Sequence, residues 1–127
     1  MKKEVPQSKK TGNSFEYDFF LSLYKRLPND KVVVSILAEL HTRYGNYDKG
    51  LILDRKLVLL DTSDPIAHYN LACSLSLKAK YLESIETLKK AIALGFNDFE
   101  LMYKDSDLSG LRGTDLFIAL KQNLKNL

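Results

Sequence analysis

The stretch that decides the fold is DPIAHYNLACSLSLKAKYLESIETLKKAIALG, residues 64–95. Its apolar residues recur at intervals of three and four, which is the spacing of one face of an α-helix. Asp64 is a favourable N-cap, and Pro65 suits the first helical position because its missing N–H needs no partner there. A short polar break interrupts the pattern. The stretch therefore predicts two helices joined by a tight turn, at residues 65–78 and 82–94.

The same pattern occurs once more, 34 residues earlier in the chain. The matched pairs are Leu37 with Leu71, Ala38 with Ala72, Gly45 with Ala79, Tyr47 with Tyr81, Leu51 with Ile85, Leu57 with Ala91, Val58 with Ile92 and Leu60 with Leu94. Three capping pairs recur at the same spacing, at 29–30, 63–64 and 97–98. A fixed period of this length indicates a helical repeat, so two further helices are predicted at 31–44 and 48–60.

Particular residues of the two copies identify the kind of repeat. The second copy carries Tyr69, Asn70, Leu71, Ala72, Tyr81, Ser84, Ile85, Leu88, Ala91, Ile92 and Leu94, and the first keeps Leu37, Ala38, Gly45, Tyr47, Gly50 and Leu60. Together they resemble the tetratricopeptide repeat, a helix–turn–helix unit. The first copy departs from the family pattern at Asp54, where a large apolar residue is usual, and at Leu57, where alanine is usual. The resemblance implies an all-α, right-handed helix–turn–helix solenoid.

Both flanks of the two full copies resemble incomplete repeats. Residues 15–27 carry an apolar stripe of helical period and align with the second helix of a repeat, so they predict a half repeat that covers the edge of the stack. Residues 99–104 predict a short helix, and Thr114 or Asp115 would cap a last one. Between these helices lies a segment that resembles the closing segment of many bacterial tetratricopeptide proteins, through Asp105, Asp107, Leu108, Leu111, Arg112, Phe117 and Leu120.

The expected organisation is thus one tetratricopeptide-like domain of about seven helices with modified terminal caps. Its parts are a disordered basic tail at 1–13 and a domain at 14–127, divided into a half repeat at 14–30, full repeats at 31–64 and 65–98, and a C-terminal cap at 99–127. The tail is predicted from its composition, because it is polar and lacks apolar periodicity.

Charge and composition limit the cellular compartment and the kinds of partner that the sequence predicts. Four lysines of residues 1–13, offset by Glu4, account for the whole net charge of +3, so the rest of the chain is neutral. No stretch is apolar enough for a membrane span. The basic start is not followed by an apolar segment, and Cys73 is the one cysteine, so the sequence predicts a cytoplasmic protein.

A catalytic or metal site needs a convergent set of groups, which the sequence does not offer. His41 and His68 do not form a metal-binding motif, and Cys73 adds no ligand pattern. Asp105 and Asp107 stand at a helix start, where capping explains them. We therefore expect no enzyme activity, no catalytic residue, no metal and no cofactor.

The resemblance places the binding surface on the first helix of each repeat, since these helices line a concave groove in such stacks. The predicted groove set is Ile36, Glu39, Arg43, Tyr69, Asn70, Cys73, Leu77 and Lys104. One branch of the family clamps the C-terminal carboxylate of chaperones with asparagines and cations. Asn70 matches one asparagine of that clamp, but Glu39 stands where a second asparagine is needed. Lys104 is the one residue that could match a clamp cation, and it does so weakly. A chaperone-tail clamp is therefore disfavoured.

Three functions remain open on the sequence. The leading one is a non-catalytic adaptor that binds a peptide or protein segment in the groove. The second is an assembly subunit, possible as a homodimer, that self-associates through an apolar groove or a terminal helix. The third is an accessory of nucleic acid or a membrane surface, acting through the tail between Lys2 and Lys10. Nothing in the rest of the chain suggests nucleic-acid binding.

Overall fold

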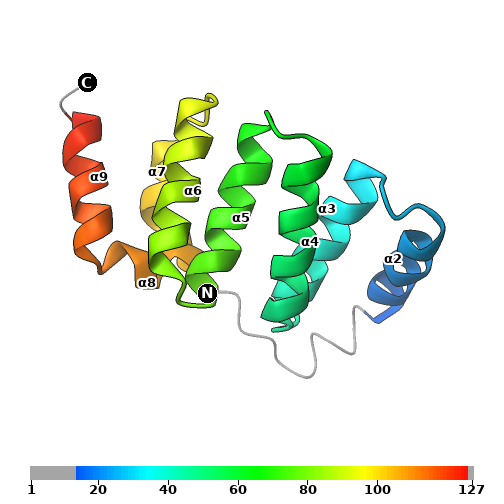
Figure 1. The fold of residues 1–127 in the computed structure, drawn as a ribbon. Helices are drawn as coiled ribbons and strands as arrows, with labels where there is room; N and C mark the ends of the chain where they lie inside the picture. The colour runs from blue at the N-terminus through cyan, green and yellow to red at the C-terminus, as the bar shows by residue number, and fades with distance from the viewer. Residues whose placement is uncertain (1–13, 126–127) are drawn as a thin grey trace. The chain divides into compact units, whose positions relative to one another are not determined.

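The structure, a computed structural model, describes residues 14–125, which form helices joined by short turns and contain no strand (Figure 1). They form α2 (Ser14–Arg26), α3 (Lys31–Arg43), α4 (Tyr47–Leu60), α5 (Pro65–Leu77), α6 (Tyr81–Ala93), α7 (Phe99–Lys104), the 3-10 helix η1 (Ser106–Leu108), α8 (Ser109–Arg112) and α9 (Asp115–Lys125). The all-α class is confirmed, and the succession of helix pairs is consistent with a helical repeat solenoid. About seven helices were expected, and the described residues form eight α-helices. The additional one is the four-residue α8. The predicted tail lies outside the described residues.

The chain divides into two compact units, Met1–Thr62 and Ser63–Leu127, each of which is described by itself. The division falls two residues before the predicted repeat boundary at residue 64. Among the described residues, no helix combines the length and the apolar character that crossing a membrane requires.

Unit 1 contains the predicted half repeat and the predicted first full repeat, as a helical hairpin of α3 and α4 with α2 packed against α3. Asp30 begins α3, since its carboxylate accepts a hydrogen bond from the Val33 amide at 3.0 Å. Gly45 ends the hairpin's first helix with φ of 80°, a left-handed conformation that glycine adopts without steric cost. Its core is formed by Val33, Val34, Leu37, Ala38, Leu40, Leu51, Leu53 and Leu57.

Unit 2 contains the second full repeat and the C-terminal cap, and its hairpin of α5 and α6 explains the small residues of the sequence. The Ser84 hydroxyl donates to the Ala72 carbonyl at 2.7 Å, and both residues are fully buried. A larger side chain at either position would hold the two helices apart. Leu88, Ile85 and Ala91 fill the space beside this contact, on the side facing the cap.

The cap of unit 2 covers the open side of this hairpin. Met102, Leu108, Leu111, Phe117 and Leu120 join the same buried cluster, and α9 lies against α6 and α8. Of the two residues predicted to cap the last helix, Thr114 is the cap. Its hydroxyl accepts a hydrogen bond from the Phe117 amide at 3.3 Å. Residues of the closing segment therefore cover the buried side of the hairpin.

Candidate functional site

The part of the groove set in unit 1 lies on α3. Ile36 is half-buried, and Glu39 is exposed. Arg43 donates to the Glu39 carboxylate at 2.8 Å, and its guanidinium also lies 3.9 Å from the Glu16 carboxylate on α2. Because two acids face one arginine, this surface does not present a free positive charge. Within the groove set, the accessible apolar group of α3 is the Ile36 side chain.

Two members of the groove set in unit 2 are turned into the protein. Tyr69 is 4% exposed and Cys73 is 6% exposed. The Tyr69 ring stacks on Phe96, with 4.2 Å between the ring centroids and 10° between the planes. Its hydroxyl donates to the Asp105 carboxylate at 2.8 Å, and the Cys73 sulfur lies 3.7 Å from the same oxygen. Both side chains therefore tie α5 to the cap and are not open to a partner, in contrast to the expectation.

The Tyr69 hydroxyl is a buried hydrogen-bond donor. Desolvation is the main cause that raises the pKa of Tyr69 far above its ordinary value, and the neighbouring Cys73 and Asp105 raise it further. The phenol stays protonated at any physiological pH. It can therefore donate to Asp105 permanently.

Cys73, Asp105 and Asp107 form a cluster that the sequence did not bring together. One ligand atom from each lies within 4.8 Å of the others. Asp105 uses one carboxylate oxygen to accept from Tyr69 and the other to accept from the Asp107 amide at 3.0 Å. With both oxygens engaged, Asp105 acts as the cap of η1 and as the link to α5, which agrees with its predicted capping role.

The remaining groove residues of unit 2 are accessible. Asn70 and Leu77 are half-buried on α5, one on either side of the buried Cys73 along the helix. Lys104 is exposed on α7, and its ammonium group donates to Glu100 at 3.1 Å. An exposed pair of this kind is weak, so Lys104 can exchange Glu100 for another acid at little cost.

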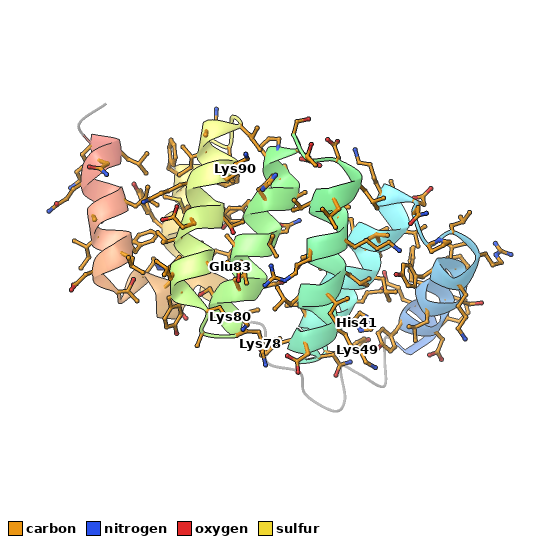
Figure 2. The ribbon with its side chains drawn as sticks, viewed as in Figure 1. His41, Lys49, Lys78, Lys80, Glu83 and Lys90 are labelled. Atoms are coloured by element: carbon orange, nitrogen blue, oxygen red, sulfur yellow. The ribbon has the colours of Figure 1, made fainter. Side chains whose placement is uncertain are left out.

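His41 belongs to the interior of unit 1. It is buried on α3, where the Tyr17 hydroxyl of α2 lies 3.0 Å from its Nδ1 atom. Burial and the nearby Lys49 of α4 lower its pKa, and Figure 2 shows the two residues at the same end of the α3–α4 hairpin. His41 is therefore neutral at pH 7, as a core residue that positions α2.

A pocket of about 370 Å³ in unit 2 was not predicted. Its lining residues are Tyr103, Arg112, Phe117, Ile118, Lys121, Gln122 and Lys125. The Lys121 ammonium group lies 5.2 Å from the centre of the Tyr103 ring, and Arg112 donates to the Met102 carbonyl at 3.0 Å. The four-residue spacing of Lys121 and Lys125 could have placed both lysines on one face of α9. Their position beside Arg112 depends on the packing of the cap, which the sequence does not show.

Comparisons with protein-family models, with curated proteins and with solved structures gave no match. The likeness to the tetratricopeptide repeat consequently rests on the residues of this chain alone.

Proposed function

We propose that the protein is a tetratricopeptide-like adaptor without catalytic activity, which binds a segment of another protein on the accessible faces of α3 and α5. The observation that carries the proposal is a contrast between equivalent positions of the two repeats. Leu37 and Ala38 have the same residue types as Leu71 and Ala72, and all four are buried. Half-exposed positions on the same helices differ, since Ile36 stands opposite Asn70 and Arg43 opposite Leu77.

This contrast is typical of a repeat used for recognition. Residues that build a repeat are restricted by packing, whereas residues on the accessible face are free to match a ligand. Ile36 and Leu77 offer apolar contact, and the Asn70 amide can both donate to and accept from a peptide backbone. An extended or helical segment with apolar side chains suits these groups.

Site-specific photo-crosslinking in the native cell tests the proposal. A photoreactive residue placed at Ile36 or Asn70 is expected to capture the same partner protein. A matched position on the second helix of a repeat, Lys89 of α6, is exposed and serves as the control. A partner captured equally well from Lys89, or none captured from α3 and α5, would contradict the proposed surface.

A pair of variants then separates binding from folding. Asn70→Ala removes a half-buried amide and is expected to weaken capture by the partner while leaving the helical content unchanged. Tyr69→Ala is unsuitable for this purpose, because it removes the stacking on Phe96 and the hydrogen bond to Asp105. If Asn70→Ala and Ile36→Ala both bind the isolated partner as the wild type does, the groove assignment is wrong.

A further inference from the structure

Helix α2 has a packed face and a second apolar face that is exposed. On the packed face, Tyr17 makes edge contacts with His41 and Tyr44 of α3 and its C-cap, and Tyr24 accepts a hydrogen bond from Lys56 of α4 at 3.0 Å. These contacts hold α2 to the rest of unit 1. They use the side of the helix that carries residues 17, 21 and 24.

The second face carries aromatic and aliphatic side chains at a spacing of four residues. Phe15 is 82% exposed, Phe19 51% and Leu27 43%, with the half-buried Leu23 between the last two. The Phe15 and Phe19 rings are stacked, with 6.5 Å between their centroids. Residues four apart lie on one side of a helix, so these four form a continuous apolar stripe, here named the α2 stripe.

A helix that ends a stack of repeats normally presents a polar outer face to solvent. In unit 1, α3 lies on one side of α2, and the described residues of this unit supply no helix for the other (Figure 1). Exposed apolar patches of aromatic residues mark interaction surfaces more often than isolated exposed residues do. We therefore expect another protein element to cover the α2 stripe.

The charges beside the stripe indicate what that element is. Asp18 lies in the first half of α2, and Lys25 and Arg26 lie in its last turn, all three exposed. They are seven and eight residues apart, which places them on the same side of the stripe after two turns. Glu16, by contrast, faces Arg43 of the same unit. The flank of the stripe is thus acidic at one end and basic at the other.

We propose that the α2 stripe binds the α2 stripe of a second copy of this chain, with the two helices antiparallel across a two-fold axis near residues 21 and 22. This arrangement places Phe15 and Phe19 against Leu27 and Leu23 of the second copy. It also brings Asp18 of each copy opposite Lys25 and Arg26 of the other, twice by symmetry. A parallel arrangement would oppose like charges. The inference is independent of the proposed binding face on α3 and α5.

The contact between the two stripes is small, which favours a weak association. A helix of 13 residues is about 20 Å long, so the pair buries less surface than a standard stable interface. We therefore expect a reversible dimer with a dissociation constant of about 10–100 µM.

Sedimentation velocity of the full chain over a range of about 5–500 µM tests the inference. The wild type is expected to pass from monomer to dimer, and Phe15→Ser with Phe19→Ser to remain monomeric with unchanged circular dichroism. Leu82→Ser, on the exposed side of α6, removes a comparably exposed residue and should dimerise as the wild type does. A wild type that stays monomeric throughout, or a Phe15→Ser, Phe19→Ser variant that still dimerises, would overturn the inference.

A charge exchange tests the antiparallel orientation without touching the apolar contact. Asp18→Lys alone and Lys25→Glu with Arg26→Glu are each expected to weaken self-association by about tenfold, because like charges then face each other twice. Mixing the two variants should restore dimerisation as a heterodimer, detected with one copy carrying a fluorescent label. Mixing that gives no more dimer than either variant alone would refute the antiparallel pairing.

Discussion

The two full repeats pack their paired helices against each other with different residues at the contact. In unit 2, the Ser84 hydroxyl of α6 reaches the Ala72 carbonyl of α5. At the equivalent position of unit 1, Gly50 of α4 has no side chain, and a Cβ there would lie 2.5 Å from the Thr42 hydroxyl of α3. The space that serine fills in one repeat is filled from the opposite helix in the other. The residue that stands between the two helices therefore differs from one repeat to the other.

The two repeats also differ in polarity at two equivalent buried positions. Leu88 and Leu75 of unit 2 are fully buried, and the equivalent residues of unit 1 are Asp54 and His41, which are also buried. Burying polar and ionisable groups costs free energy even when they have partners. At these two positions the leucines of unit 2 should therefore stabilise their repeat more than Asp54 and His41 stabilise theirs.

The largest expected effect comes from Leu88→Ala. The side chain is 0% exposed and lies at the centre of the cluster shared by α5, α6 and the cap. Its truncation should lower the free energy of unfolding by about 3 kcal/mol, since a buried leucine loses both apolar burial and packing. Urea unfolding measures the loss, and hydrogen exchange should show faster opening of α5 and α6. Unchanged exchange there would show that unit 2 does not depend on this contact.

Gly50→Ala should have the next largest effect, a loss of about 2 kcal/mol, because the added methyl group overlaps the buried Thr42 side chain. In a Thr42→Ala background the same substitution should cost much less, and urea unfolding of the four variants gives the coupling. At the equivalent position, Ser84→Ala should cost about 1 kcal/mol through a lost hydrogen bond instead. Coupling near zero between positions 42 and 50 would exclude the steric explanation.

The sequence predicted the local features of both repeats well and the long-range ones poorly. The predicted bounds of the helices of both hairpins agree with the structure within one residue, because caps such as Asp30 and Asp64 act over a few residues. The burial of Tyr69 was not predicted, since it depends on Phe96 and on Asp105, which is 36 residues away. The pocket beside Arg112 likewise arises from the packing of α7, α8 and α9, which no single periodic segment contains.

A smaller, pH-dependent difference in stability is expected between the two repeats, because His41 of the first stands where the second has Leu75. Burial, together with Lys49, lowers the pKa of folded His41 below its ordinary value of 6.5. Below pH 6.5 the unfolded chain therefore binds more protons at this position, so the stability of unit 1 should fall as the pH is lowered and level off above that value. Protonation would also prevent Nδ1 from accepting a hydrogen bond from Tyr17 of α2.

His41→Leu, which places the residue of the second repeat in the first, should remove this part of the pH dependence. The measurement is urea unfolding between pH 5 and 7.5, with an NMR titration of the His41 ring to locate its pKa. His68→Gln is the matched control for the other histidine. An identical slope in wild type and His41→Leu would assign the pH dependence to other groups.

The smallest effect concerns the turns, where the two repeats differ by one residue. Ala79 has φ of 58°, and Gly45 at the equivalent position has φ of 80°. Both residues are exposed, so a substitution at either position affects the backbone conformation without changing side-chain packing. Alanine is strained in the left-handed region, and Ala79→Gly should therefore raise the free energy of unfolding by about 0.5–1 kcal/mol, despite the greater freedom of glycine in the unfolded chain. Gly45→Ala should lower it by a similar amount. Thermal unfolding should shift by about 2–4 °C in opposite directions for the two variants. A shift of the same sign in both would mean that the turns are not equivalent, and the repeats would then differ in backbone as well as in side chains.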